Sequence, residues 1–270
     1  MLTNPLVLAG VAVLLPLLAP LLLARSTWQL TYPRLALGAW LAAFLGGFGV
    51  SAYLLGVVVA RAIAANPAGP PVRSVIFTLG AWGMLGAAGA AASLIWSRAE
   101  PLASSQHRDL RLVAPLATAR HARGRFTIVT FDSPEPTAHT GSPLSREVYI
   151  SRGLREALPA AKVEAIIEHE LVHLRQWHGP IVRLAEINSA CLPKRLRAGR
   201  EFKRAALLLV ELIADDAAAR RVGPARYANT LLAMGEATGD AVFELRARRL
   251  EHRDWRPSSL ATAWRLLRAH

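Results

Sequence analysis

The sequence has a single cysteine, Cys191, few acidic residues and very little charge in its first hundred positions. One cysteine excludes an internal disulfide and a CxxC metal site, and it fits a reducing compartment. The 19 acidic residues are outnumbered by 32 lysines and arginines, so the formal net charge is +13. No DNA- or RNA-binding motif with the expected spacing accompanies this charge. We therefore expect basic surfaces that lie against an anionic membrane leaflet, and no direct contact with nucleic acid.

Residues 1–97 contain three apolar stretches, each long enough to cross a bilayer, which takes about 20 residues. They are Asn4–Ala24, Leu35–Ala60 and Val75–Ser97. The first does not resemble a signal peptide, because no positive charge precedes it and Arg25 follows it. No fourth stretch of this length occurs later in the sequence. Residues 1–97 are thus predicted to form a membrane domain of three spanning helices.

Arginines near the ends of these stretches predict the orientation. The side that holds the first loop and the segment after the third stretch is the richer in arginine, with Arg25, Arg34, Arg98, Arg108 and Arg111. The other side has only Arg61 and Arg73. By the positive-inside rule, we expect a multi-pass protein of the cell membrane with its amino terminus outside and everything after Ser97 in the cytoplasm.

The charged remainder predicts a small, mainly helical α+β domain. Residues 98–125 form a charged connector. Residues 126–222 form a separate domain that contains the candidate catalytic and metal-binding residues. The segments "RFTIVTF" (Arg125–Phe131) and "REVYIS" (Arg146–Ser151) alternate and contain β-branched residues, which is typical of strands.

Helices are expected over Pro159–Trp177 and Arg200–Val222, with Gly223 and Pro224 ending the second. Between them, Pro180–Pro193 is apolar but too short to span a bilayer, so we expect an interfacial or re-entrant segment. A helical segment over 223–270 completes the chain. Overall we predict a mainly α membrane protein.

The segment "EHELVH" (Glu168–His173) places two histidines four residues apart within the first of these helices. At 3.6 residues per turn, His169 and His173 lie on one face and can both reach a zinc ion at about 2.0–2.1 Å. Glu170 is offset by about 100°, beside the metal, where a general base accepts a proton from the attacking water. HExxH is also short enough to occur by chance in helices of many proteins.

A third ligand is needed to decide between these alternatives. His178 lies about 180° from His169 around a continuous helix, so we expect a helix-end residue that interacts with free carbonyl groups. Glu211, on the next long helix, is the better candidate. Asp215 follows one turn later on the same face and can accept the outer N–H of a zinc-binding histidine. Two acidic residues in an apolar helix are costly to bury unless they meet a cation.

Other acidic residues leave alternatives open. Glu211 could pair with one of the many arginines instead of a metal. Glu186 and Glu201 are weaker ligand candidates, because neither has an acidic partner one turn downstream on the same face.

Three segments together resemble the membrane-embedded gluzincins, namely the BlaR/MecR antirepressor peptidases and, more distantly, the HtpX/Ste24-type peptidases. They are "EHELVH", "ELIADDAA" (Glu211–Ala218) and "PTAHTGSPLSREVYISRGL" (Pro136–Leu154), and the similarity covers roughly Phe126–Val222. The resemblance implies a zincin-like catalytic domain with Zn²⁺ as its cofactor. BlaR/MecR sensors carry an extracellular penicillin-binding domain after the peptidase, and this sequence ends without one, so we do not expect beta-lactam sensing by this chain alone.

The resemblance also implies roles for individual residues. Carried over by position, His169, His173 and Glu211 are the zinc ligands, Glu170 is the base and Asp215 orients a ligand. The strand around Ala138 and His139 is similar to the edge strand that binds substrate in this family as an added strand. His139 could also donate a hydrogen bond to the oxyanion, or be an exposed loop histidine.

These expectations favour a membrane-anchored zinc endopeptidase that cleaves a protein substrate in the cytoplasm, with a transcriptional repressor as one candidate. The alternative is a non-catalytic membrane scaffold or regulatory protein that keeps a structural metal site. Structural zinc sites usually fill four positions with protein ligands, whereas three are evident here, which favours catalysis. A membrane-bound DNA-binding regulator is a third hypothesis and rests on charge alone.

Overall fold

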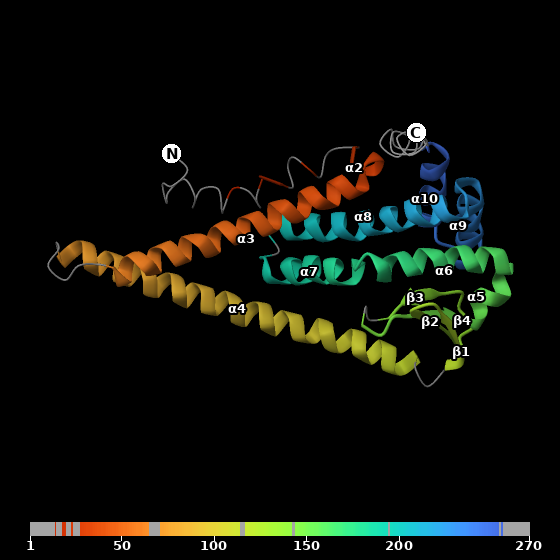
Figure 1. Ribbon diagram of the computed structural model, residues 1–270, viewed down its shortest axis with the longest axis horizontal. Coiled ribbons are helices and arrows are strands. Elements are labelled where there is room, and N and C mark those ends of the chain that lie inside the picture. The colour runs from red at the N-terminus through yellow and green to blue at the C-terminus, as the bar shows by residue number, and fades with distance from the viewer. Residues whose placement is uncertain are drawn as a thin grey trace, which may run out of the picture.

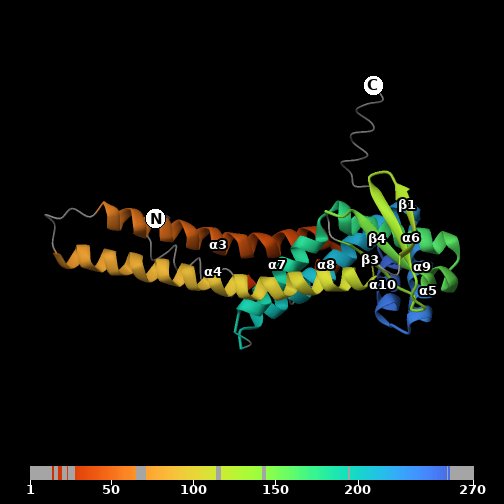
Figure 2. The ribbon, with the colours of Figure 1, turned by 90° about the horizontal axis from the view of Figure 1, so that it is seen from below.

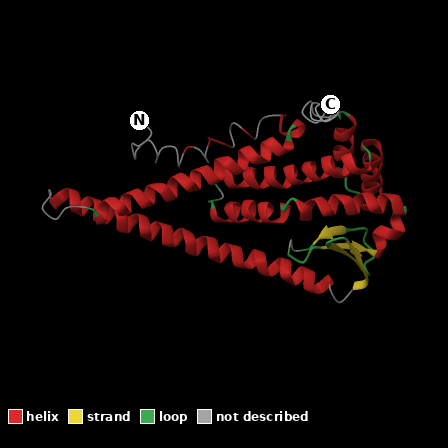
Figure 3. Ribbon diagram, viewed as in Figure 1, coloured by secondary structure: helices red, strands yellow, loops and turns green. Residues whose placement is uncertain are grey.

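The computed structural model describes residues 28–64, 71–113, 117–141, 144–193, 195–253 and 255, together with the isolated residues 14, 18, 19 and 23. Over these ranges the chain is mainly helical, with one small sheet (Figure 3). Apart from the isolated residues, the predicted first spanning stretch, Asn4–Ala24, lies outside the described residues.

Two described helices are long and apolar enough to cross a membrane. A short helix, α2 (Trp28–Thr31), leads into α3 (Pro33–Ile63), and α4 (Pro71–Val113) follows. Only 6% of the most apolar window of each helix is buried, whereas the core helix of a soluble protein is mostly buried. In Figure 1, α3 and α4 lie close together near Ile63 and Pro71 and spread apart toward the rest of the molecule. They cover the second and third predicted spans.

A four-stranded sheet follows α4. Its strands are β1 (Ala117–Arg123), β2 (Phe126–Phe131), β3 (Ala138–Thr140) and β4 (Glu147–Ser151), in the order β1-β2-β4-β3. The parallel pair β2–β4 forms the centre, and β1 and β3 add antiparallel on either side. The two predicted strands are confirmed as β2 and β4. Strand β1 falls in the predicted connector, where "ATARHAR" has only alanines as apolar residues and so gives no strand pattern.

Six helices complete the described chain. They are α5 (Arg152–Ala157), α6 (Ala160–Arg175), α7 (His178–Cys191), α8 (Arg197–Val222), α9 (Pro224–Thr238) and α10 (Val242–Glu251). Helices α6 and α8 confirm the two predicted helices, and α7 covers most of the apolar segment predicted between them. Helices α9 and α10 lie in the predicted C-terminal helical segment.

Helix α6 occupies the centre of the domain that follows α4, because it is apolar on more than one face. One face packs on the sheet, where Ile128 and Ile150 meet Ile166 and Leu171 in a continuous core. Helix α8 packs beside α6 and covers a second core, which it shares with α3 and α7. Figure 2 shows the sheet and α6 at the end of the molecule away from the end of α3 and the start of α4. Side chains that point from α6 toward α8 therefore lie in a protected position between two helices.

Candidate metal centre

Helix α6 positions the two histidines of "EHELVH" on one face. Residues Leu171 and Val172, between the histidines, are buried in the core, which fixes the helix rotation. His169 is buried and His173 is partly exposed, and their Nε2 atoms are 3.1 Å apart. Both inner nitrogens thus face the same point beside α6.

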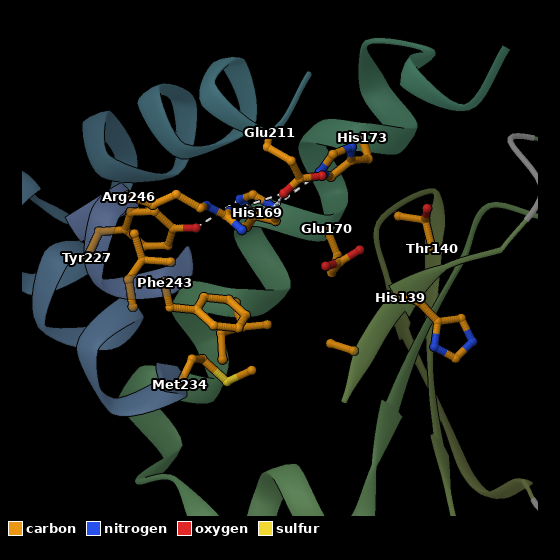
Figure 4. A pocket seen from close by; sticks show the side chains of 13 residues that line it. His139, Thr140, His169, Glu170, His173, Glu211, Tyr227, Met234, Phe243 and Arg246 are labelled. Carbon is orange, nitrogen blue, oxygen red and sulfur yellow. Dashed lines mark hydrogen bonds and ion pairs between the residues drawn. The ribbon is translucent and has the colours of Figure 1, made fainter. Parts of the chain in front are cut away.

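Helix α8 brings Glu211 to that point. Its carboxylate oxygens lie 3.3 Å from Nε2 of His169 and 3.5 Å from Nε2 of His173 (Figure 4). Donor atoms that bind one tetrahedral zinc ion at about 2.0–2.1 Å lie roughly 3.3 Å from one another. The three separations match that spacing and the donor types are those of zinc, so His169, His173 and Glu211 form a group that could hold a metal ion.

The outer ring nitrogen of His169, Nδ1, contacts Asp215 and Tyr227 on the side away from Glu211. This atom lies 3.2 Å from Oδ1 of Asp215 and 2.8 Å from the hydroxyl of Tyr227. The Tyr227 hydroxyl also donates to Oδ1 of Asp215 over 3.0 Å. Because an ionised carboxylate can only accept, the proton of the imidazole sits on Nδ1. When His169 is neutral, as a metal ligand must be, the lone pair of Nε2 is therefore available on the side of Glu211.

Arg246 on α10 completes this arrangement. Its guanidinium donates to both oxygens of Asp215, over 2.8 and 2.6 Å, and lies 3.1 Å from Oε2 of Glu211. Burial alone would raise the pKa of Asp215, but the hydrogen bonds from Arg246 and His169 outweigh it and hold that pKa below its usual range. The pKa of Glu211 is lowered to about 2 because contact with His169 and the charge of Arg246 outweigh its burial. Both carboxyl groups are therefore ionised.

His178 supports the second histidine in a way that the sequence analysis did not predict. Trp177 adopts a left-handed conformation with φ of 56°, which breaks the regular helix between α6 and α7. This break returns His178 to His173, and their Nδ1 atoms are 3.1 Å apart. Burial lowers the pKa of His178 to about 4, so its ring is neutral. The expected interaction with helix-end carbonyl groups is wrong, because it assumed a continuous helix.

Glu170 occupies a different position from the three possible ligands. Its side chain is partly exposed and points into a cavity of about 360 Å³ that the histidines also line (Figure 4). Among the described residues, none forms a hydrogen bond or ion pair with its carboxylate. Burial, together with the charge of Glu211, raises the pKa of Glu170 to about 7. A carboxyl group placed in this way can exchange protons with a molecule in the cavity.

The sheet forms the opposite wall of the cavity through β3, which is the edge strand on this side. Gly141 N–H donates to the Glu147 carbonyl and Ser151 N–H donates to the Thr137 carbonyl, so hydrogen-bonded pairs alternate along β3 and β4. The backbone groups of Ala138 and Thr140 consequently point to the open edge. Ala138 thus lies on an edge strand, and its role in substrate binding stays a prediction.

His139 faces the other side of the sheet. Its ring stacks on Tyr149 with centroids 5.2 Å apart and meets the edge of Phe131 at 5.7 Å. In Figure 4 the ring points away from His169 and His173. The suggested hydrogen bond from His139 to an oxyanion therefore has no support in this geometry, and the histidine packs on the sheet instead of being an exposed loop residue.

The remaining acidic candidates are engaged elsewhere. Glu186 pairs with Lys203 at 3.2 Å, and Glu201 lies 4.0 Å from Arg204. Glu168, the first residue of the motif, faces away from the metal group and is enclosed by arginines from β1, α6 and α8, namely Arg123, Arg175 and Arg221. It ties the sheet to both helices of the site.

The sequence analysis did not identify two residues of the site. Tyr227 and Arg246 come from α9 and α10, in a segment that was predicted only to be helical. Arg246 is one of 32 basic residues and has no motif spacing to the other site residues. The useful signal was the acidic pair itself, because a buried Asp215 beside Glu211 requires a cation.

No protein-family model matches the chain, and neither the curated proteins nor the solved structures include one with significant similarity to it.

Proposed function

We propose that this protein is a membrane-anchored, zinc-dependent endopeptidase. The observation that carries the proposal is the convergence of His169, His173 and Glu211 from two helices, with Glu170 free in the adjoining cavity. Zinc is the favoured ion because two imidazoles and one carboxylate are the protein ligands of many catalytic zinc sites, which keep a fourth position open. A site with four protein ligands would have favoured a structural role.

Each residue of the site has its own role in the proposed hydrolysis. Zinc held by the three ligands would supply Lewis acidity, which polarises the scissile carbonyl group and lowers the pKa of a water molecule. Glu170 accepts the proton of the attacking water and passes it to the leaving amine nitrogen. Asp215 and Tyr227 hold the ring of His169, and His178 holds that of His173, so that both imidazoles keep their orientation.

The open edge of β3 supports a polypeptide substrate. An extended segment can pair with the outward backbone groups of Ala138 and Thr140 and pass along the cavity toward Glu170. Such pairing uses main-chain hydrogen bonds and so accepts many sequences. A transcriptional repressor, as the resemblance to BlaR/MecR peptidases implies, is one candidate of this kind.

The membrane location is part of the same proposal. Large apolar side chains on α3 and α4 are exposed, among them Phe48, Leu79 and Trp82, as expected of surfaces that face lipid. The arginine distribution favours a metal centre on the cytoplasmic side. An amino terminus outside the cell further requires the predicted first span, Asn4–Ala24, most of which lies outside the described residues.

The test compares three purified full-length proteins in detergent: wild type, Glu170→Gln and the control Glu164→Gln. Each is assayed for bound zinc by mass spectrometry and for cleavage of a peptide library. We expect Glu170→Gln to retain zinc and to lose cleavage by at least about a hundredfold, because the proton acceptor is gone. Glu164 lies on the same helix and is half exposed, so its substitution should change neither quantity.

Three outcomes would count against the proposal. Cleavage by Glu170→Gln at the wild-type rate would exclude the mechanism. Bound zinc in a wild-type protein that cleaves no peptide would favour the scaffold alternative. Absence of zinc from the wild-type protein would remove the basis of the metal centre.

A further inference from the structure

Helices α7 and α8 form a hairpin whose tip lies beside α3. Phe202, near the start of α8, stacks on Trp40 and Phe44 with ring centroids 5.9 and 5.4 Å apart. Leu192 and Ala198, on either side of the turn, line the same small cavity as Phe44. The tip of the hairpin therefore reaches the level of Phe44 along α3. In Figure 1, α7 and α8 accordingly end partway along α3.

The length of α3 beyond that level matches a bilayer. From Leu45 to Ile63 the helix extends about 28 Å at 1.5 Å per residue, and the hydrocarbon core of a bilayer is about 30 Å thick. The core shared by α3 and the hairpin includes no residue of α3 beyond Phe44. If α3 spans the membrane with this apolar section, the hairpin tip lies at the membrane surface.

The tip is strongly basic. Between the two helices and in the first turns of α8, the sequence contains Lys194, Arg195, Arg197, Arg200, Lys203 and Arg204, with Glu201 as the single acidic residue. Arg195, Arg197 and Arg200 are exposed and form no ion pair with any described residue. Positive charge at the start of a helix opposes the helix dipole, and the first turn of α8 contains no acidic residue. An anionic partner would offset this unfavourable charge.

We infer that this basic tip, residues 195–204, is a binding surface for the headgroups of anionic phospholipids. Leu196 lies between two of the arginines and is 40% exposed, so it can enter the interface while its neighbours contact phosphate. The tip would hold the hairpin, and with it Glu211 on α8, at a defined height above the bilayer. The inference depends on α3 spanning the membrane and is independent of peptidase activity.

The first experiment locates the tip. In a Cys191→Ser background, a nitroxide is attached to Leu196→Cys, or to the control Arg155→Cys on α5. Each full-length protein is reconstituted in nanodiscs of phosphatidylcholine with phosphatidylglycerol. We expect the label at 196 to collide more often with oxygen than with a water-soluble nickel complex, and the label at 155 to show the reverse. Equal, water-like behaviour of both labels would overturn the inference.

The second experiment measures lipid preference. Spin-labelled phosphatidylglycerol and phosphatidylcholine are compared for association with the reconstituted protein at low salt, where charge effects are least screened. The wild type should favour the anionic lipid by at least about threefold, and combined Arg195→Gln, Arg197→Gln and Arg200→Gln should remove most of that preference. A matched control replaces three exposed arginines far from the tip, Arg155→Gln, Arg226→Gln and Arg248→Gln.

The control makes the result specific, because both triple variants change the net charge equally. An unchanged preference in the tip variant, or an equal loss in the control, would overturn the inference. The first of these results would indicate an acidic protein partner for the tip instead of lipid. Zinc content, measured in parallel, should stay at the wild-type level in both variants, since neither set touches the metal centre.

Discussion

A single buried carboxylate organises the metal centre at the level of residues. Asp215 is fully buried and accepts hydrogen bonds from Tyr227 and Arg246 while it contacts His169. An unpaired carboxylate in this position would cost several kcal/mol, so Arg246 stabilises the folded protein. Because Arg246 also approaches Glu211, one cation offsets the charge of both acidic residues, which otherwise would repel each other beside the metal.

This arrangement predicts unequal effects of two conservative substitutions. Asp215→Asn removes the charge that fixes the proton of His169 on Nδ1, so zinc affinity should fall by about 10- to 100-fold. Tyr227→Phe leaves Asp215 in contact with His169 and should weaken zinc binding much less. Both are measured by competition with a fluorescent chelator. Equal affinities for Asp215→Asn and the wild-type protein would contradict the assigned orientation of His169.

Some of these residues could be predicted from sequence and others could not. His169, Glu170 and His173 have fixed spacing within one helix, and Asp215 follows Glu211 by one turn, so helical geometry alone relates them. Arg246, Tyr227 and His178 are positioned by tertiary contacts or by a left-handed turn at Trp177, for which local sequence carries no periodic signal.

At the level of elements, the position of the edge strand β3 is set by hydrogen bonds that hold the loop before it. The Ser151 side chain accepts hydrogen bonds from the N–H groups of Thr137 and Leu154, and Gly153 N–H donates to the Ser133 carbonyl. Gly153 lies so close to Pro134 that a Cβ atom there would collide with the proline carbonyl oxygen. The glycine thus allows the loop to pass directly over the start of α5.

We expect Gly153→Ala to displace this loop and to destabilise the protein by about 1–3 kcal/mol, as overpacking does. Peptide cleavage should fall further than stability alone explains, because β3 moves with the loop. Thermal unfolding in detergent and the cleavage assay measure the two effects. Gly38→Ala, on α3 where an added Cβ meets nothing within 4 Å, is the control. Full activity and an unchanged melting temperature for Gly153→Ala would refute this explanation.

The elements also show where sequence patterns are informative. Strands β2 and β4 are buried on the α6 side and carry β-branched residues, and α6 and α8 have clear apolar faces, so all four were predicted. Strand β1 was missed because its contribution is backbone pairing with β2 instead of apolar side chains. Pairing of that kind depends on a partner strand and leaves little trace in composition.

At the scale of the whole molecule, a helix long enough to cross a membrane is in contact with a helix that carries part of the candidate metal centre. Helix α3 packs along α8, which carries Glu211. Helix α10 carries Arg246 to the metal centre. Its Arg249 donates to the Leu30 carbonyl in α2, just before α3, and pairs with Asp216 at 3.0 Å. A displacement of α3 relative to the bilayer would therefore act on two helices that hold the site. The lengths and apolarity of α3 and α4 were readable from sequence, whereas this contact with α10 was not.

The orientation of the whole molecule can be tested with two single cysteines in a Cys191→Ser background. Ala64→Cys lies at the end of α3, and Arg155→Cys lies on α5 beside the sheet; both positions are exposed. If the arginine distribution sets the topology, a membrane-impermeant maleimide should label residue 64 in intact cells and residue 155 only after the membrane is opened. The reverse pattern would place the metal centre outside. Labelling of both residues in intact cells would mean that α3 and α4 do not separate two compartments.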